Sequence, residues 1–426
     1  MLATDTSAAQ LPESKQSYTR EEVALHKKHD DCWIIIHGKV YNVTPWLKRH
    51  PGGAKVLLHY AGDDATVAFE SFHNDKAYAQ RYMVPFHIGY IVSEQAQLPE
   101  ISRDFLKMRK TFEAEGLFKV KPLFFIAHFL HIIAMHWMAF FVLWYFGNTW
   151  VTWLTAVVLV TASQAQAGWL QHDFGHLTVF NSTRLNHIAH DVTIGLLKGV
   201  SSFWWNYRHF QHHAKPNVFM KDPDVTAAFL FLLGKWGQKH KGVMPYHLQH
   251  KYFFLIGPPL LLPVYFHIEV LAYTILKKKI KDLITMLIFY ACFPHSLCTF
   301  DGRFLESHWF VWATQISHLA KDVDFDKERD WASLQLNGTR NVEQSFFKDW
   351  FLGHLNFQIE HHLFPTMPRH NFQLAQPRVI EFCKKHNLNY ELMPLSDAFK
   401  DIISSLEQSG RIYKEAWDEA SLHKMM

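Results

Sequence analysis

The sequence has little cysteine, and the four cysteines that it has are scattered. Cys32, Cys292, Cys298 and Cys383 form no C-x-x-C pair among the 426 residues. This spacing argues against a disulfide framework and against a thiolate zinc site. We therefore expect the catalytic part of the chain to face a reducing compartment.

The sequence also lacks an excess of charge of one sign. Lysine and arginine number 43 and aspartate and glutamate 39, for a formal net charge of +4, so nucleic acid is not an expected partner. Only 19% of residues are charged and 49% are hydrophobic, which excludes a disordered or fibrous chain. No Walker-type loop or dinucleotide fingerprint is present, so a separate reductase is expected to oxidise NADH.

Residues 1–17 contain no apolar run, so we expect a flexible tail without a cleavable signal and an amino terminus in the cytosol.

Residues 18–92 are expected to form a small α+β domain, with short strands around a turn at Gly38. Within it, His50 opens the motif His-Pro-Gly-Gly, and His73 follows 23 residues later. Two neutral imidazoles can bind the opposite axial positions of a heme iron, which favours electron transfer. For the His-Pro-Gly-Gly motif alone, an ordinary turn after a surface histidine is the alternative.

The wider pattern of this segment resembles a cytochrome b5 domain over its whole length. It comprises Tyr18-Thr-x-Glu-Glu-Val, Trp33-Ile-Ile-Ile and Gly38-Lys-Val-Tyr-Asn-Val-Thr. Asn42 stands where that family usually has aspartate, at a strand edge away from the ligands. The resemblance implies heme b, held by His50 and His73.

Long apolar runs begin after residue 121. Residues 93–121 mix apolar residues with lysine and arginine and are expected to be a basic linker on the membrane surface. Phe124–Phe146 and Trp150–Leu170 are each long enough to cross a bilayer core of about 30 Å, and they form a hairpin with both ends on the cytosolic side.

Two further crossings are expected between Tyr252 and Ser317, for about four transmembrane helices in all. The first covers Tyr252–Leu276, and the second lies within Leu283–Phe300 and Phe304–Ser317. In this scheme the lysines of residues 277–281 lie on the lumenal side, against the positive-inside bias.

Three groups of histidines follow the apolar runs at spacings that suit metal ligands. The first is His172-Asp-Phe-Gly-His176, the second His209-Phe-Gln-His212-His213, and the third Gln358-Ile-Glu-His361-His362. Residues four apart lie on one face of a helix, so both can reach one metal, and nitrogen-rich sites without thiolates suit iron. Any one group alone is more simply a pair of surface histidines. An even number of membrane crossings between the groups returns all three to the cytosolic face, where they can form one site.

These three boxes, preceded by the His-Pro-Gly-Gly domain, resemble the front-end fatty acyl desaturases with a fused cytochrome b5, in particular the animal Δ6/Δ5 branch. The resemblance covers nearly the whole chain. It implies a multi-domain protein: the heme domain at 18–92 and an all-α polytopic membrane desaturase domain at 122–426. It also implies two non-heme iron ions, O2, a long-chain polyunsaturated acyl-CoA substrate, NADH-cytochrome b5 reductase as electron donor, and an endoplasmic reticulum membrane with the heme domain and boxes in the cytosol. The implied iron ligands are His172, His176, His209, His212, His213, Gln358, His361 and His362, with His318 as a further one.

The sequence departs from this family in one region and leaves two alternatives open. The segment of residues 282–303 is shorter than expected, and so is the loop from Gly234 to Tyr246. A catalytically impaired membrane heme carrier is therefore one alternative, and a b5-fused fatty acyl or sphingolipid hydroxylase is the other. For the position of the new double bond, Asn341-Val-Glu-Gln-Ser-Phe-Phe favours Δ6 and His250-Lys-Tyr-Phe-Phe favours Δ5.

Overall fold

The computed structural model describes residues 16–225, 230–234, 244–292, 297–325 and 329–425. The chain divides into two compact units, Met1–Pro99 and Glu100–Met426, and each is described by itself. Cys32 and Cys383 are buried free thiols, whereas the side chains of Cys292 and Cys298 lie outside the described part.

The first unit is built on a five-stranded sheet with the strand order β1-β5-β4-β3-β2, in which β1 and β5 are parallel and the other pairs antiparallel. The strand Asp31–Ile36 alternates its side chains between two cores, as a period of two requires. Cys32 and Ile34 face one core and Ile35 the other. The strands are β1 (Gln16–Tyr18), β2 (Lys27–Lys28), β3 (Asp31–Ile36), β4 (Lys39–Asn42) and β5 (His87–Ile91).

Short helices cover this sheet, and the two histidines predicted to hold heme lie at their ends. His50 lies shortly before α2, and His73 is the C-terminal cap of α3. The helical elements are α1 (Arg20–Val23), η1 (Thr44–Trp46), α2 (Ala54–Leu58), α3 (Thr66–Phe72), α4 (Lys76–Met83), η2 (Val84–Phe86) and η3 (Ser93–Gln95).

The second unit is mostly helical. Its first helix, α5 (Glu100–Ala114), falls in the segment expected to be a linker, and it packs against α14 and α17. Phe105 and Phe112 on α5 are fully buried, and the ring of Phe105 stacks on Phe364. The part of the segment that α5 occupies therefore belongs to the packed unit.

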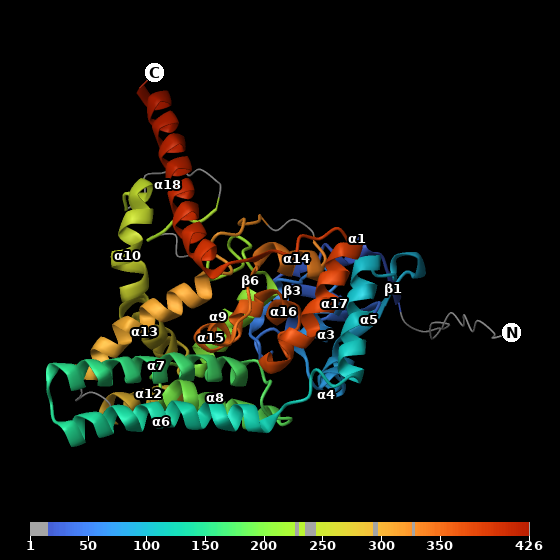
Figure 1. Ribbon diagram of the computed structural model, residues 1–426. Helices are drawn as coiled ribbons and strands as arrows, with labels where there is room; N and C mark the ends of the chain where they lie inside the picture. The colour runs from blue at the N-terminus through green and yellow to red at the C-terminus, as the bar shows by residue number, and fades with distance from the viewer. Residues whose placement is uncertain (1–15, 226–229, 235–243, 293–296, 326–328, 426) are drawn as a thin grey trace. The chain divides into compact units, whose positions relative to one another are not determined.

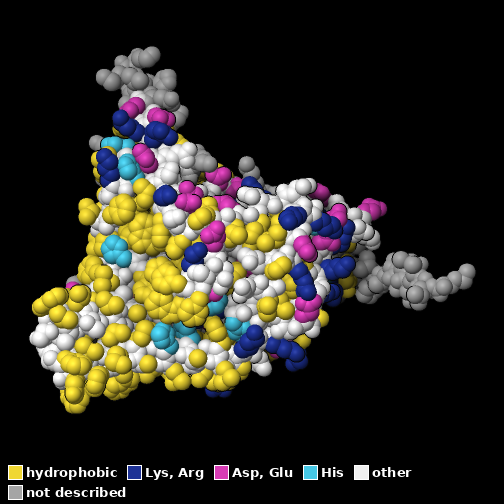
Figure 2. Space-filling model, viewed as in Figure 1, with side chains coloured by type: hydrophobic (Ala, Val, Ile, Leu, Met, Phe, Trp, Pro, Cys, Tyr) yellow, Lys and Arg dark blue, Asp and Glu magenta, His cyan; other side chains and the backbone are white. Residues whose placement is uncertain are grey.

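Two long helices, α6 (Pro122–Phe146) and α7 (Trp150–Gly175), form a hairpin and run side by side in Figure 1. Most large side chains of α6 are exposed, and Figure 2 shows hydrophobic side chains over this region. Within the described residues, two helical stretches are long and apolar enough to cross a membrane, Pro122–Phe146 and Tyr246–Leu276. The four expected crossings stay a prediction.

The elements between the first and third histidine groups include two π-helical stretches, Asp191–Leu196 and Leu261–Phe266. One of them, Leu261–Phe266, follows two prolines, Pro258 and Pro259, that interrupt the helical hydrogen bonding of α10. The elements are α8 (Thr183–His190), η4 (Asp191–Leu196), α9 (Ser202–Ala214), η5 (Tyr246–Leu248), α10 (Gln249–Leu260), η6 (Leu261–Phe266), α11 (His267–Leu276), α12 (Ile280–Cys292) and α13 (Leu297–Gln315). Part of the segment expected to be short, residues 293–296, lies outside the described residues, as do 235–243 of the loop before Tyr246.

The lysine cluster at residues 277–281 lies beside the segment that joins the first two histidine groups. Lys281 forms an ion pair with Asp191, and the carboxylate of Asp282 accepts a hydrogen bond from the Ser201 hydroxyl. The joining segment is too short for two crossings of about 20 residues each, so it stays on the side of the histidine groups. These contacts favour the side of the histidine groups for the lysine cluster, in line with the positive-inside bias, and its lumenal placement stays a prediction.

The C-terminal part of the chain packs onto the histidine-bearing helices. Its core includes Trp169 of α7, Val311 of α13 and Ile402 of α18. The elements are α14 (Trp331–Gly338), β6 (Asn341–Val342), α15 (Phe346–Leu352), η7 (Leu355–Phe357), α16 (Gln358–Leu363), η8 (Arg369–Asn371), α17 (Phe372–Lys385), β7 (Leu392–Met393) and α18 (Leu395–Met425), with β6 and β7 parallel.

Candidate metal centre

The three histidine groups lie on three helices that meet. The first group is in the last turns of α7, the second in the last turns of α9, and the third on α16. Most of these histidines are buried and only His172 and His209 are half-buried, which excludes the alternative that the groups are ordinary pairs of surface histidines. The tertiary packing brings the groups together in two adjacent clusters.

The first cluster, site A, consists of five histidines whose ligand nitrogens all lie within 4.8 Å of one another. The Nε2 atoms of His176 and His209 are 2.8 Å apart, and those of His209 and His213 are 3.1 Å apart. The single proton of a neutral imidazole can serve only one such contact, so the convergence suits lone pairs directed at one metal ion. Site A comprises His172, His176, His209, His213 and His361.

The second cluster, site B, consists of His212, His318 and His362, whose ligand nitrogens lie within the same limit. Gln358 completes it, because its Nε2 is 2.7 Å from Nε2 of His318. Its Oε1 is buried and has no hydrogen-bond partner among the described residues. A half-turn of the amide would direct this carbonyl oxygen, a good metal ligand, toward site B.

Each histidine of site B is oriented by an oxygen that faces its other ring nitrogen. An imidazole that donates from Nδ1 keeps the lone pair on Nε2, so these contacts select the tautomer that can bind a metal. The pairs are His212 with Asp222 Oδ2 at 2.8 Å, His318 with the carbonyl oxygen of Gly338 at 2.8 Å, and His362 with Gln335 Oε1 at 3.0 Å.

Burial keeps most of these histidines neutral, which is the protonation state that binds a metal. It lowers the pKa of His176 and that of His318 to about 3. His212 differs: burial lowers its pKa, but the buried carboxylate of Asp222 outweighs that effect and raises it. The Nε2 atoms of His361 and His362 are buried and unpaired among the described residues. Both clusters therefore fit metal ions in their burial, donor atoms and tautomers.

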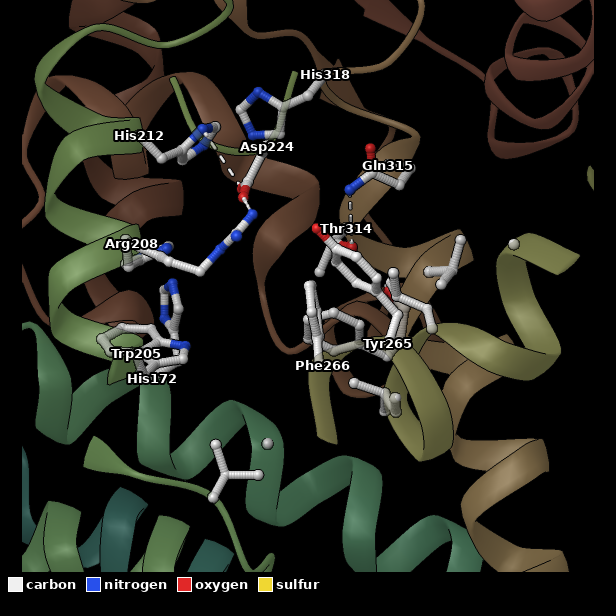
Figure 3. A pocket seen from close by; sticks show the side chains of 18 of the residues that line it. His172, Trp205, Arg208, His212, Asp224, Tyr265, Phe266, Thr314, Gln315 and His318 are labelled. Carbon is white, nitrogen blue, oxygen red and sulfur yellow. Dashed lines mark hydrogen bonds and ion pairs between the residues drawn. The ribbon is translucent and has the colours of Figure 1, made fainter. Parts of the chain in front are cut away.

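A cavity of about 230 Å³ borders both clusters. Figure 3 shows His172, Trp205 and Arg208 on one wall and Tyr265 and Phe266 on the opposite wall. Phenylalanine, leucine and valine side chains line much of the rest. A concave, mostly apolar space that ends on candidate metal ligands suits a long alkyl chain. The cluster residues on its surface are His172, His209, His212, His318 and Gln358.

A buried ion pair also borders this cavity. Lys198 and Glu306 are 8% and 1% exposed, form an ion pair, and Nζ of Lys198 donates to the carbonyl oxygen of Gln164 at 2.9 Å. A Cβ added at Gly168 would lie 3.7 Å from Nζ of Lys198. Since Gly168 is one helical turn before His172, the ammonium lies close to site A.

In the first unit, the predicted heme ligands face each other. The ring centroids of His50 and His73 are 6.3 Å apart, which leaves room for one iron between two imidazoles at bonds of about 2 Å. The Nδ1 atoms face the carbonyl oxygens of Gly53 at 3.3 Å and Phe69 at 3.0 Å, so both Nε2 atoms are available. Burial, with a smaller effect of His73, lowers the pKa of His50 to about 4. These two residues fit a heme.

Every residue predicted to bind iron therefore lies in one of the two clusters, including His318. Whether they bind metal stays a prediction. Sequence reasoning missed the partners that orient them, such as Asp222, which faces His212. The acidic residue ten positions after His212 is the feature of the sequence from which this partner could have been predicted. Gln335 follows no recognisable spacing.

Comparison with known proteins agrees with the division of the chain into the units Met1–Pro99 and Glu100–Met426. A family model for fatty acid desaturases matches residues 148–393, more than half of the chain, and one for the cytochrome b5-like heme/steroid binding domain matches residues 19–92. Two solved structures match about the length of the first unit: cytochrome b5 of Ostreococcus tauri virus 2, at 33% identity over 18% of this chain and 95% of that one, and cytochrome b558 of Ectothiorhodospira vacuolata, at 38% identity over 18% and 99%. The TM-score is 0.17 in both cases.

Proposed function

This chain belongs to the fatty acid desaturase family and carries a cytochrome b5-like domain, and from this premise we propose that it is a front-end desaturase of long-chain polyunsaturated fatty acyl-CoA. The observation that carries the proposal is the pair of buried nitrogen-rich clusters on one apolar cavity. In the proposal, site A and site B each hold one iron ion, and His50 and His73 hold heme b. Two such ions supply the reductive activation of O2.

The residues of the cavity would determine which methylene groups react. An alkyl chain has no polar handle along its length, so its position is set by the depth and the bend of the space that holds it. Phe253 and Val311 are among the buried apolar residues that line the cavity, and His172 belongs both to the cavity lining and to site A. We favour insertion of a cis double bond at Δ6, with Δ5 as the second possibility.

Electrons would reach the metal centre one at a time through the heme of the first unit. The two axial histidines leave no open position on that heme, which suits electron transfer rather than O2 chemistry. NADH-cytochrome b5 reductase is the proposed donor, since the sequence has no dinucleotide fingerprint of its own. These partners imply an endoplasmic reticulum membrane with the heme domain and the histidine boxes on the cytosolic side.

For the membrane topology we propose the helical hairpin α6–α7 as one pair of crossings, with α10 and α11 as a re-entrant pair. The start of α10 is tied to the C-terminal helix, because Gln249 Nε2 donates to the carbonyl oxygen of Leu406 at 2.7 Å. The end of α11 leads into the lysine cluster beside Asp191. Both ends of the pair therefore lie on the side of the histidine groups. A tag inserted at Lys278 should be accessible from the cytosol; a lumenal tag would contradict the scheme.

Expression of the full chain in yeast tests the function. Cells fed linoleate or dihomo-γ-linolenate separately should form a new double bond, at Δ6 or Δ5 respectively, as mapped by gas chromatography and mass spectrometry. His361→Ala should abolish the product while the protein remains in the membrane. His386→Ala is the matched control, since His386 pairs with Asp104 outside both clusters. Product formation by His361→Ala, or a hydroxylated product from the wild type, would contradict the proposal.

A further inference from the structure

Site A borders a second and much smaller cavity. Its volume is about 10 Å³, which is close to the minimum that holds one water molecule. The two cavities share His172 and Leu355, but the lining of the small one is otherwise different and includes charged and polar groups. Site A therefore borders two separate spaces, a large and mostly apolar one and a small one with a buried ion pair in its wall. The polar lining includes Asp173, Thr178 and Arg369.

The charged residues of the small cavity have unused hydrogen-bonding capacity. Arg369 and Asp173 are 5% and 3% exposed, and Nε of Arg369 is 3.1 Å from Oδ2 of Asp173. Nη1 of Arg369 donates to the carbonyl oxygen of Gly353 at 3.1 Å, whereas its buried Nη2 has no partner among the described residues. A buried guanidinium donor without an acceptor is costly, and an ordered water molecule is the usual remedy where space allows.

The chemistry of the proposed reaction produces water. Desaturation converts a –CH2–CH2– pair and O2, with two electrons and two protons, into –CH=CH– and two water molecules. The electrons come from the heme in the proposed function, on which this inference rests. An alkyl chain that fills the larger cavity displaces water from the part of that cavity that borders site A.

We propose that Arg369 and Asp173 hold one water molecule in the small cavity, against site A, while the acyl chain occupies the larger cavity. Arg369 Nη2 donates to this water, and the Asp173 carboxylate accepts from it. The two residues are positioning residues for the water. The small cavity is thus the place where water lies against site A while the acyl chain is bound in the larger cavity.

The test uses the full chain in nanodiscs, loaded with heme and iron, reduced and kept free of O2. Nitric oxide is the reporter: it binds ferrous non-heme iron with an open position and gives an electron paramagnetic resonance signal, whereas a heme with two histidine ligands has no open position. In D2O, pulsed measurements detect exchangeable deuterons close to that iron. Linoleoyl-CoA is added to fill the acyl cavity, where it cannot react without O2.

We expect the deuteron signal of water to persist after linoleoyl-CoA binds. Thr178, whose hydroxyl donates to the carbonyl oxygen of Asp173 at 3.0 Å, offers a matched pair of variants. Thr178→Val replaces the hydroxyl by a methyl group of similar size and should keep the signal, whereas Thr178→Ile is one heavy atom larger at the cavity wall and should abolish it. Arg369→Lys keeps the buried charge, lacks Nη2 and should weaken the signal several-fold.

Loss of the wild-type signal on addition of linoleoyl-CoA would overturn the proposal, and so would an unchanged signal in Thr178→Ile that has bound iron. Iron content, the heme absorption band and nitrosyl formation are measured on every sample. A chain without non-heme iron, or one that never forms a double bond, contradicts the proposed function instead. The two failures are therefore distinguishable.

Discussion

Asp222 holds His212, a histidine of site B, in the tautomer that can bind metal. Substitution of Asp222 by asparagine should therefore weaken metal binding at site B alone. The carboxylate is fully buried and makes three contacts of 2.8 Å: Oδ2 accepts from Nδ1 of His212 and from the backbone N–H of Asn217, and Oδ1 accepts from the backbone N–H of Asp224. All three partners are donors, and an amide has only one acceptor oxygen.

In Asp222→Asn, one side of the amide must therefore face a donor with its NH2 group. If the NH2 group faces His212, the imidazole has to accept at Nδ1, and the proton moves to Nε2, which can then no longer bind metal. If it faces Asp224, a buried N–H is left unpaired at a cost of about 1–3 kcal/mol. Loss of a partner that orients a metal ligand lowers metal affinity about 10- to 100-fold, which corresponds to about 1.4–2.7 kcal/mol.

The assay is metal retention by the full chain in nanodiscs, dialysed against a series of chelator concentrations and analysed by mass spectrometry. We expect the wild type to release its two non-heme irons at high chelator concentration and Asp222→Asn to release one of them about 10- to 100-fold earlier. Asp224→Asn is the control, because Asp224 is 3.7 Å from Nδ1 of His212 and 39% exposed, and it should have a much smaller effect. Retention of both irons by Asp222→Asn, or equal loss from both sites, would refute this reasoning.

Three further perturbations test other parts of the structure. Gly168→Ala should be tolerated, because its Cβ would only touch Lys198 at 3.7 Å, whereas Gly168→Leu should project into the acyl cavity and sharply reduce conversion of long chains relative to short ones in fed yeast. Glu306→Gln breaks the buried pair with Lys198 and should lower the free energy of unfolding by about 3–5 kcal/mol, most of which the double variant Lys198→Met/Glu306→Gln should recover in thermal melts. In the heme unit, burial raises the pKa of Glu70, but hydrogen bonds from His37 and a lysine outweigh it and lower the pKa to about 2. The stabilisation is present above pH 4.5 and is lost as the pH falls toward 2, so Glu70→Gln should flatten the loss of thermal stability over that range, as followed by the heme absorption band.

Local patterns in the sequence were sufficient for the elements that carry the site. The apolar runs before Gly147 and after Thr149 predicted the hairpin of α6 and α7 nearly to the residue. Side-chain alternation predicted the strands of the heme unit, and the distance along the chain from His50 to His73 suggested a shared heme. Such patterns are short in range, and hydrogen bonding and burial within one element express them directly.

The side of the membrane on which the lysines at 277–281 lie does not follow from such local patterns. Length and hydropathy of the preceding run predict a crossing, but they do not say whether a helix interrupted by Pro258 and Pro259 returns to the side from which it came. The contacts of Lys281 and Asp282 with the segment between the first two boxes are tertiary, and they favour the side of the histidine groups.

The sequence by itself determined which side chains the two histidine clusters contain. Only the tertiary structure decided how they are shared between two sites. His212 and His213 are neighbours in the chain but belong to sites B and A, and His361 and His362 divide in the same way. Consecutive residues of a helix point about 100° apart, so a pair of adjacent histidines cannot face one centre. Which member faces which centre depends on the helices packed around it, and that information is spread over the whole fold.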